Sequence, residues 1–548
     1  MKRICLDIET DGFDPSHIWC VGTEDIDTGE TRLFLESDRL KFREFMRDVE
    51  EVLGFNVLQF DLPILDNLWG VRVPVDQVTD ILILCQLEQP GREGGNSLEA
   101  WGGRLRFPKM DMEKEDFYRG YTEDMGIYCM NDVRLTVKLY HHITSVMAGR
   151  FSKDSIRLEH QVKAITSRQE VNGFYLDEFK AMSLSADFSE RLTEITEKMQ
   201  EIFPPKEIQL KTKVKYEPFN PGSRKQIAER LMERGWVPEK HTEKGNVVVD
   251  ETTLASIDMD EAKVLAEYLM LQKRAAQVKS WLEAINPKTG RVHGRVLTLQ
   301  TITGRMAHAS PNMAQVPAVY SPYGAECRGC WTVPSDKKVL VGIDASSIEL
   351  RMLCHYMKDE DYTTQVVSGD IHTYNQQLAE LPSRDQAKTF IYALLYGAGA
   401  AKIGSIIGKG AAEGQQIMDR FFLNLSSFQD LKTKVNKAAE RGWIAGLDKR
   451  TLHIRTVHAS LNTLLQGGSA ILMKRALVIF DKLIKEQGLN AIFVANVHDE
   501  WQLEVDKDHG DVVGKLGVDA IKRAGDYYKL RCPLDGEYKV GTSWAETH

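Results

Sequence analysis

The stretch Arg384-Asp-Gln-Ala-Lys388-Thr-Phe-Ile-Tyr392-Ala-Leu-Leu-Tyr396-Gly397 decides how this chain of 548 residues is interpreted. Two cations and two phenol rings recur at every fourth position, and such positions line one stripe of an α-helix. Cations at one end of the stripe suit a polyphosphate, and flat rings further along suit a base. The spacing therefore predicts a helix that binds a nucleoside triphosphate. The alternative is an amphipathic surface helix with incidental charges.

The composition is that of a folded chain large enough for two or three domains, with 43% hydrophobic and 27% charged residues. We expect no membrane span, because no uninterrupted apolar run has the required length. The eight scattered cysteines are typical of reduced thiols in a cytoplasmic enzyme, and no signal peptide is expected before the first strand. The chain has a net charge of −9, of which residues 1–150 carry −11 and the remainder carries +2. Nucleic-acid binding is still possible, because clustered cations decide it.

Acidic residues end several apolar runs among the first 150 residues. The run from Arg3 closes on Asp7 and Glu9 and opens a predicted antiparallel meander, residues 54–60 form a predicted strand closing on Asp61, and Tyr128 and Asp132 share one face of a predicted helix. Acids that converge need cations, and carboxylate oxygens suit Mg²⁺ or Mn²⁺. Two such metals can hydrolyse a phosphodiester, with Tyr128 orienting the water. The alternative is a set of solvated surface acids.

Two acids mark a second site. Residues 337–343 form a predicted strand that ends at Asp344, and residues 491–497 form another that leads into His498-Asp499-Glu500. Carboxylates close together in a turn between strands repel one another unless cations bind them. Asp344 and Asp499 are therefore predicted to share two Mg²⁺ ions with a triphosphate. Glu500 is either a further ligand or a supporting acid. Asp80 is either an accessory acid or the cap of the following helix.

These motifs resemble two known families. The acids of the first domain resemble the DEDD-type 3′–5′ exonucleases of the tyrosine subclass, which have a ribonuclease-H-like fold. Residues 344–351, 384–397 and 497–500 resemble motifs A, B and C of the DNA polymerase I family, family A, and most of all the replicative polymerases of the T-odd phages. Further segments that match are Ser97–Gly102, Phe219–Ser223, Thr303–His308 and His458–Gln466.

The resemblance implies an α/β and α+β multidomain chain. A ribonuclease-H-like 3′–5′ exonuclease domain is expected over residues 1–150 and a right-hand polymerase domain over 151–548, with the thumb at about 180–290, the fingers at about 370–450 and the palm in the remainder. It implies a template-directed DNA polymerase that proofreads and replicates phage DNA. Two alternatives are an exonuclease whose second domain only binds DNA, and a single-subunit RNA polymerase.

The resemblance also implies a role for each matching residue. The metal ligands it implies are Asp7, Glu9, Asp61 and Asp132 in the first site, and Asp344, Asp499 and the Ala345 carbonyl in the second. The nucleotide is bound by His372, Arg384 and Lys388, and Lys388 protonates the leaving pyrophosphate. Tyr392 stacks on the incoming base, Tyr396 closes the base-pair pocket, and Glu349, tethered by Tyr392, excludes a 2′-hydroxyl. The duplex is contacted by Arg305, Gln466 and His498.

The implied cofactors are two Mg²⁺ per site, which Mn²⁺ can replace, with deoxynucleoside triphosphates as substrates. The implied partners are primer–template DNA, a helicase–primase and a single-strand binding protein, with the chain itself a monomer. The T-odd relatives carry a long basic insertion that recruits thioredoxin. Here only residues 204–218 occupy that place, so no thioredoxin clamp is expected. Lys206, Lys211, Lys213 and Lys215 form either a short basic DNA-binding loop or a solvated one.

Overall fold

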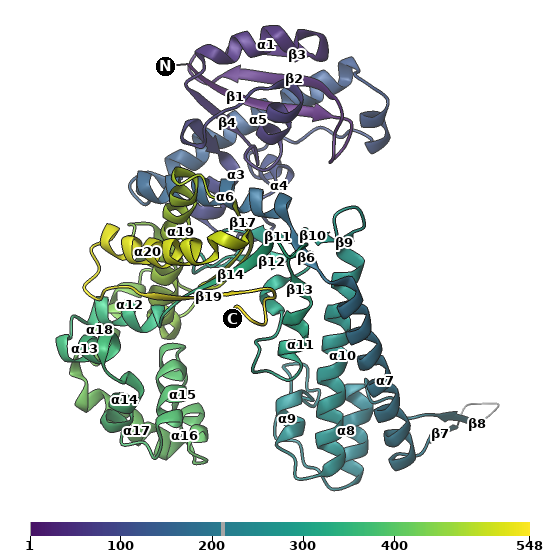
Figure 1. The fold of residues 1–548 in the computed structure, drawn as a ribbon, viewed down its shortest axis with the longest axis vertical. Coiled ribbons are helices and arrows are strands. Elements are labelled where there is room, and N and C mark those ends of the chain that lie inside the picture. Colours follow the sequence, from purple (N-terminus) through teal and green to yellow (C-terminus); the bar gives the residue numbers. More distant parts are fainter. Residues whose placement is uncertain (1, 210–213) are drawn as a thin grey trace. The chain divides into compact units, whose positions relative to one another are not determined.

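The computed structural model describes residues 2–209 and 214–548, which divide into two compact units (Figure 1). The first unit contains the residues up to Asn172, Arg295–Ala309 and Val341–Val540. The second contains Gly173–Gly294, Ser310–Leu340 and Gly541–His548. Lys211 and Lys213 of the predicted basic loop lie outside the described residues.

The first unit begins with a five-stranded sheet in the order β3-β2-β1-β4-β5. Its strands are β1 (Arg3–Thr10), β2 (Ile18–Asp25), β3 (Thr31–Leu35), β4 (Glu51–Gly54) and β5 (Val78–Asp80). Strands β1 to β3 form the antiparallel meander expected from the sequence, while β4 and β5 run parallel to β1. Helix α5 (Glu123–Met147) packs across β1 and β2, and the other helices here are α1 (Arg39–Phe45), α2 (Asp61–Ile64), α3 (Ile81–Glu88) and α4 (Leu98–Arg104). A continuous apolar core joins the sheet to these helices.

The prediction of a strand over residues 54–60 is wrong. Strand β4 ends at Gly54, and residues 55–60 form a turn in which Asn56 has a positive φ of 61°. The backbone amides of Asn56 and Leu58 donate hydrogen bonds to the Asp80 carboxylate at 3.0 and 3.1 Å. This buried side chain takes the place of a neighbouring strand as hydrogen-bond partner, so the apolar run is not a strand.

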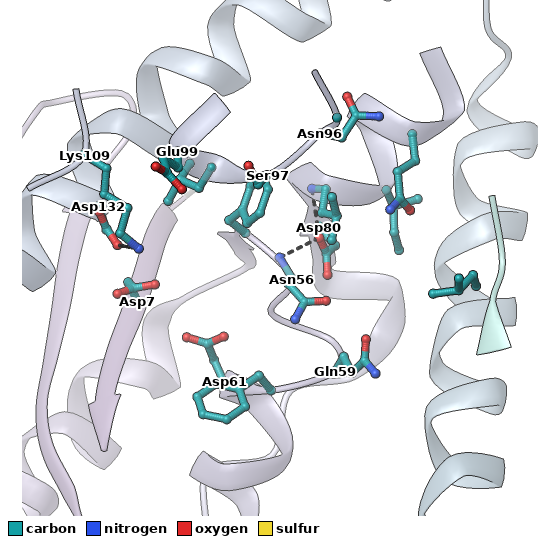
Figure 2. Close-up of a pocket in the computed structure, with 18 of the residues that line it drawn as sticks. Asp7, Asn56, Gln59, Asp61, Asp80, Asn96, Ser97, Glu99, Lys109 and Asp132 are labelled. Carbon is teal, nitrogen blue, oxygen red and sulfur yellow. Dashed lines mark hydrogen bonds and ion pairs between the residues drawn. The ribbon is translucent and has the colours of Figure 1, made fainter. Parts of the chain in front are cut away.

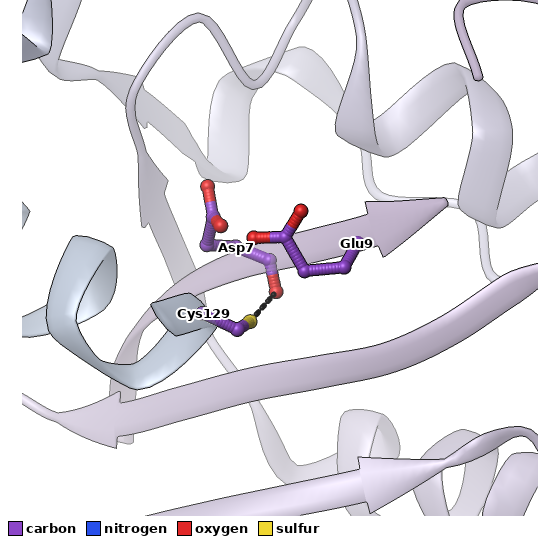
Figure 3. A group of neighbouring side chains, drawn as sticks. All are labelled: Asp7, Glu9 and Cys129. Carbon is purple, nitrogen blue, oxygen red and sulfur yellow. Dashed lines mark hydrogen bonds between the residues drawn. The ribbon is translucent and has the colours of Figure 1, made fainter. Parts of the chain in front are cut away.

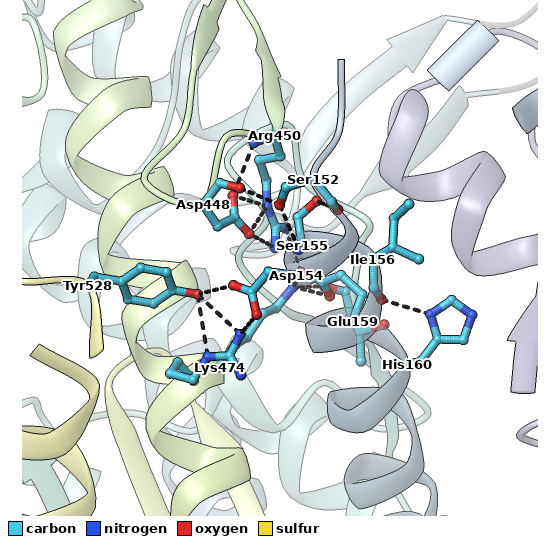
Figure 4. Close-up of polar contacts among 12 residues, drawn as sticks. Ser152, Asp154, Ser155, Ile156, Glu159, His160, Asp448, Arg450, Lys474 and Tyr528 are labelled. Carbon is cyan, nitrogen blue, oxygen red and sulfur yellow. Dashed lines mark hydrogen bonds and ion pairs between the residues drawn. The ribbon is translucent and has the colours of Figure 1, made fainter. Parts of the chain in front are cut away.

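Helix α6 (Lys153–Asn172) connects the two halves of the first unit. It contacts β5 and α3 on the N-terminal side, and α19 (Ser460–Glu486) and β17 (Ala491–Val497) on the C-terminal side. A buried polar network lies where α6 meets α19: Lys474 Nζ is 2.7 and 2.9 Å from the Glu159 carboxylate oxygens, and Arg450 joins Glu159 to Asp448 (Figure 4). Burial opposes the charge on Glu159, but Lys474 and Arg450 lower the pKa of its carboxyl.

The C-terminal half of the first unit is built on a four-stranded sheet in the order β17-β18-β14-β19. Besides β17, its strands are β14 (Lys338–Ala345), β18 (Glu500–Asp506) and β19 (Gly536–Gly541). Helices α19 and α20 (Gly510–Tyr527) pack side by side against each other. Residues Val457–Glu486 are long and apolar enough to cross a membrane, but 78% of the apolar window is buried inside the fold. That burial is typical of a core helix.

A group of helices follows β14 in the sequence. They are α12 (Ile348–Met357), α13 (Glu360–Ser368), α14 (Ile371–Ala379), α15 (Arg384–Leu395), α16 (Ala400–Ile406), α17 (Ala411–Asn424) and α18 (Ser426–Ala439). Two short hairpins complete the unit, β11 (Arg295–Leu297) with β12 (Ala307–Ala309) and β15 (Trp443–Ala445) with β16 (Thr451–His453). The helix predicted from the four-residue spacing is α15, whose Phe390, Ile391, Leu394 and Leu395 are buried.

The second unit contains two long helices, α7 (Glu178–Ile202) and α10 (Asp260–Ala284), that pack against each other (Figure 1). Its other elements are β6 (Phe174–Leu176), β7 (Lys206–Gln209), β8 (Val214–Glu217), α8 (Arg224–Glu233), α9 (Glu251–Ala255), β9 (Ile285–Asn286), β10 (Arg291–Val292), α11 (Gly324–Gly329) and β13 (Trp331–Thr332). Strands β7 and β8 form a hairpin between α7 and α8. Lys206 Nζ lies 3.6 Å from Glu229 Oε2 and 3.5 Å from Glu233 Oε1. These two acids of α8 therefore offset the charge of Lys206.

Candidate active sites

The predicted nuclease residues converge on one cavity of about 1180 Å³ (Figure 2). Strand β1 supplies Asp7 and Glu9, the start of α2 supplies Asp61, and α5 supplies Tyr128 and Asp132. The backbone amide of Ile8 donates to Asp61 at 3.2 Å, which fixes this acid against β1. All five predicted residues therefore face one space, although they come from three distant segments of the sequence.

Asp80 shapes this site without belonging to the acid cluster. Its carboxylate accepts the amide of Leu82 at 3.0 Å and so caps α3, as one of the two sequence interpretations held. Because the same carboxylate binds the amides of Asn56 and Leu58, it also holds the turn that leads to Asp61. His160 of α6 accepts the amide of Asp80 at 2.8 Å. The Asp80 carboxylate thus fixes the backbone of two segments, the turn before Asp61 and the first turn of α3.

The acid cluster has the electrostatics of a divalent-cation site. Burial, followed by repulsion from Glu9, raises the pKa of Asp7 well above its ordinary value. Burial raises the pKa of Glu9 to about 8 and that of Asp61 to about 7. One Asp132 carboxylate oxygen, Oδ1, is buried and has no hydrogen-bond partner among the residues that the structure describes. The charged form of these carboxylates is unfavourable unless a cation compensates it. The acid cluster therefore fits the binding of Mg²⁺ or Mn²⁺, which prefer carboxylate oxygens as ligands.

Cys129 lies beside Asp7 and Glu9, with ligand atoms within 4.8 Å of one another (Figure 3). Its thiol donates to the Asp7 backbone carbonyl at 3.4 Å. Contact with the Cys20 thiol, and then burial, raise the pKa of Cys129. A protonated, soft sulfur is a poor ligand for hard cations, so Cys129 supports the backbone of β1 instead.

A cation that the sequence interpretation missed lies among these acids. Lys109 Nζ is 2.7 Å from Asp132 Oδ2 and 5.0 Å from the centre of the Tyr128 ring. Lys109 precedes α5 by more than a dozen residues, and no local periodicity places it near Asp132. Only the fold of the loop between α4 and α5 brings it there.

The two acids of the second site lie on neighbouring strands. Asp344 is in β14, and Asp499 is in the two-residue turn between β17 and β18, where His498 has a positive φ of 58°. The Ala345 amide donates to the Asp499 carbonyl at 3.1 Å, which joins the two segments. Burial, then Asp499 and Glu500, raise the pKa of Asp344 to about 8. This pair also fits a divalent cation, because its charge is poorly compensated.

Glu500 is buried and accepts a hydrogen bond from Gln502 at 2.7 Å.

Strand β19 approaches β14 closely at Asp344. A Cβ on Gly536 would lie 2.9 Å from the Asp344 carbonyl oxygen. A residue larger than glycine would push these two strands apart.

The predicted partner of Glu349 is wrong. The Tyr396 hydroxyl, not that of Tyr392, bonds to the Glu349 carboxylate at 3.0 and 3.1 Å, and Arg305 donates to the same carboxylate. Helix α15 ends at Leu395 and Tyr396 is its C-cap residue, whose amide still donates to the Tyr392 carbonyl at 2.9 Å, so Tyr396 lies one turn beyond Tyr392. Glu349 itself is buried at the start of α12.

The remaining nucleotide-binding candidates lie on α14 and α15. Arg384 Nε donates to Asp370 at 2.8 Å, and Lys388 is exposed one turn further along. The rings of His372 and Tyr392 are 6.3 Å apart, and His372 Nδ1 is buried without a partner among the described residues. Burial, then Glu349, raise the pKa of Tyr392.

The duplex-contact candidates are only partly brought together. Arg305, His498 and Asp499 line one small cavity, together with Lys474 of α19. Gln466 lies half-buried on the same helix, one turn before the part of α19 that lines this cavity. Arg305 and His498 thus line the same cavity as Asp499, whereas Gln466 lies next to it.

Comparison with known proteins agrees with this architecture. Residues 181–546 match DNA polymerase family A, and residues 4–106 match the RNase_H superfamily. The DNA-directed DNA polymerases of Escherichia phage T7 and Enterobacteria phage T3 are each 32% identical to this chain, over 86% of it and 85% of the relative. The POL domain of Pol1 from M. smegmatis, solved in complex with DNA primer-template and dNTP, superposes with a TM-score of 0.82 at 19% identity, covering 99% of this chain and 95% of that one. This last likeness shows the fold.

An RNase H-like domain followed by a polymerase fold, each with a cluster of acids, defines a nucleic-acid polymerase with an attached nuclease-type domain. The chain belongs to DNA polymerase family A, and it is a DNA-directed DNA polymerase with relatives in phages. The family and fold class expected from the sequence are confirmed.

Proposed function

We propose that this chain copies a DNA template and also removes mispaired nucleotides from the primer 3′ end, by separate reactions at its two acidic sites. The observation that supports the proposal is that one chain carries two clusters of carboxylates, at different sheets, whose raised pKa values fit the binding of divalent cations. When bound, Mg²⁺ or Mn²⁺ supplies activation of the attacking oxygen and neutralisation of charge at the leaving oxygen. The assignment of Mg²⁺ is part of this proposal.

At the polymerase site, the primer 3′-hydroxyl loses its proton to solvent and its oxygen attacks the α-phosphorus of a deoxynucleoside triphosphate. The bond between that phosphorus and the bridging oxygen breaks, and pyrophosphate leaves with a proton from Lys388. Asp344, Asp499 and the Ala345 carbonyl hold the cations. Arg384 at the start of α15 and His372 at the start of α14 bind the phosphates, because a guanidinium and an imidazole donor suit a polyphosphate.

The base pair is checked next to these groups. Tyr392 stacks on the incoming base and Tyr396 borders the pair. Arg305 and Gln466 donate to minor-groove acceptors that correct pairs share, and His498 contacts the primer end. Arg305 is suited to this role, because it lines the same small cavity as Asp499.

At the nuclease site, water attacks the phosphorus of the 3′-terminal phosphodiester. The bond from phosphorus to the 3′-oxygen breaks, which releases a nucleoside 5′-monophosphate and leaves a 3′-hydroxyl on the shortened strand. Asp7, Glu9, Asp61 and Asp132 hold the cations. Tyr128 orients the water, since it lies one helical turn from Asp132 in the same cavity.

We assign the nuclease domain to residues 1–150 and the polymerase domain to 151–548. In the latter the thumb spans about 180–290, which includes α7 and α10, and the fingers span about 370–450, which includes α14 and α15. The palm contains β14, β17 and β18. The partners that this proposal requires are primer–template DNA and deoxynucleoside triphosphates. A helicase–primase and a single-strand binding protein are the expected replication partners.

The two reactions are separable, because different elements hold their cations. We expect Asp7→Ala with Glu9→Ala to abolish degradation of a labelled primer and to preserve its extension. Asp499→Ala should have the opposite effect. Loss of a metal ligand removes several kcal/mol of stabilisation, so each activity should fall by orders of magnitude.

The measurement is gel analysis of a primed template with and without nucleotides, and thermal unfolding verifies that each variant is folded. A folded variant that loses both activities contradicts the assignment. Extension by the Asp7→Ala, Glu9→Ala variant with deoxynucleotides but not ribonucleotides also excludes both alternatives, a nuclease with a binding platform and an RNA polymerase.

A further inference from the structure

Lys109 is not one of the five predicted nuclease residues, but it projects into the same cluster of acids (Figure 2). Its Nζ pairs with Asp132 Oδ2 at 2.7 Å and lies 5.0 Å from the centre of the Tyr128 ring. Only 29% of its side chain is exposed. It therefore contacts both the residue proposed to bind a cation and the residue proposed to orient the attacking water.

The backbone of the loop holds Lys109 in this place. The Phe107 amide donates to the Gly102 carbonyl at 2.9 Å, and a Cβ on Gly102 would lie 3.1 Å from the Lys109 backbone nitrogen. The loop thus lies directly on α4, where a larger residue would displace it. Arg106 has a positive φ of 51°, which costs free energy in a non-glycine residue. Lys109 is consequently positioned by the fold and does not depend on chance contact of a long side chain.

The pairing leaves room for a cation on the same carboxylate. Lys109 uses Asp132 Oδ2, whereas Oδ1 is buried and has no hydrogen-bond partner in the described part of the chain. Asp132 can therefore bind a cation through one oxygen and Lys109 through the other. An ammonium group has three donors, so Lys109 can bind Asp132 and a further acceptor at once.

We propose that Lys109 is a substrate-binding residue that donates to a phosphate oxygen of the 3′-terminal phosphodiester. The inference rests on the proposed nuclease function. A phosphorus attacked by water at Tyr128, with its oxygens near cations on Asp132, must lie next to the Lys109 ammonium. The competing role is that of a counter-ion that only offsets the charge of the acids.

The test is binding of a short single strand, too short to form a primer–template, in Ca²⁺ to prevent cleavage. Its terminal linkage is either a phosphodiester or an uncharged methylphosphonate. We expect the neutral linkage to weaken binding to the wild-type chain about tenfold, as loss of a charged hydrogen bond does. Lys109→Met should bind the charged strand about tenfold more weakly than the wild-type chain, and the neutral linkage should cost it less affinity than it costs the wild-type chain, because only the contact with Ca²⁺ is then lost. Lys109→Arg should restore much of the sensitivity to the linkage.

Lys138→Met is the matched control, because Lys138 is an exposed cation on α5, the helix of Asp132, and its Nζ lies 5.5 Å from the centre of the Phe107 ring. Lys109→Gln replaces Lys109→Met if the latter does not fold. Unchanged binding by the Lys109 variant, or an equal loss for charged and neutral strands, would overturn the proposal in favour of the counter-ion. If the wild-type chain does not degrade the charged strand in Mg²⁺, the nuclease function fails, yet the binding comparison still decides the role of Lys109.

Discussion

Glu349 illustrates how a single side chain acquires its role from its neighbours. It is buried at the start of α12 and accepts hydrogen bonds from the Tyr396 hydroxyl and the Arg305 guanidinium. A carboxylate bonded on two sides has little rotational freedom, and its position is therefore fixed. A fixed acid next to the nucleotide site is suited to exclude a 2′-hydroxyl.

At this scale, Glu349→Ala should raise ribonucleotide incorporation more than it lowers the use of deoxynucleotides. Tyr396→Phe should have a smaller effect in the same direction, because it removes one hydrogen bond of about 0.5–1.5 kcal/mol. The measurement is the ratio of kcat/KM for the two sugars. An equal loss for both sugars in Glu349→Ala would mean that Glu349 is only structural.

Tyr392 supports a second prediction about the sugar. The resemblance to family A polymerases implies that Tyr at this position allows dideoxynucleotides to be accepted and that Phe discriminates against them. The phenol oxygen can take the place of a missing 3′-hydroxyl and satisfy its neighbours. We expect efficient chain termination in the wild-type chain and resistance in Tyr392→Phe, read from sequencing-type ladders at fixed nucleotide ratios. Equal termination by both proteins would contradict this role.

At the scale of elements, α6 determines how the two halves of the first unit are joined. Its Glu159 is fully buried with Lys474 and Arg450, while its His160 reaches the nuclease side (Figure 4). Ion pairs of this kind contribute little net stability over apolar packing, but removal of one partner is costly. The network thus specifies one arrangement of α6 against α19.

His160 makes this junction sensitive to acid. Its Nδ1 donates to the Ile156 carbonyl and its Nε2 accepts the Asp80 amide, both at 2.8 Å, so the ring must be neutral. Burial lowers its pKa in the folded chain, although Asp80, Glu159 and Glu51 oppose this. Above pH 6.5 the ring is neutral in both states. Below that pH the unfolded chain takes up the proton first, so stability is lost as the pH falls.

We therefore expect His160→Gln to be less stable than the wild-type chain at pH 7.5. The difference in stability between the two proteins should become smaller towards pH 5. Each tenfold difference in proton affinity between the two states is worth about 1.4 kcal/mol. Apparent unfolding temperatures of both proteins across this range measure the gap. A gap that stays constant would show that His160 does not titrate in this way.

At the scale of the whole molecule, the short connection between α7 and α8 predicts how the enzyme stays on DNA. Without a bound clamp, the duplex is held by lysine and arginine contacts to phosphates, and this attraction weakens steeply with salt. We expect low to moderate processivity that falls as salt rises, with no gain from thioredoxin. Lys206 contributes little to this, because Glu229 and Glu233 lie near it.

Single-turnover extension of a long primed template with a DNA trap, with and without thioredoxin, tests this prediction. A T-odd phage polymerase with its insertion serves as the positive control. A strong increase in product length with thioredoxin, or long products without any partner, would refute the argument.

Local patterns in the sequence determined much of this protein. The four-residue spacing from Arg384 specified α15, and the turn His498-Asp499 specified the β17–β18 hairpin, because helical period and turn chemistry depend on neighbouring residues alone. The order of acids also predicted which carboxylates the fold brings near one another, although Asp61 follows a turn and not a strand. Tertiary structure decided the rest. Lys109 meets Asp132, Tyr396 replaces Tyr392 at Glu349, and Asp80 turns an apolar run into a clamped loop. Each of these contacts depends on how segments far apart in the sequence pack together. A local sequence pattern does not predict such packing.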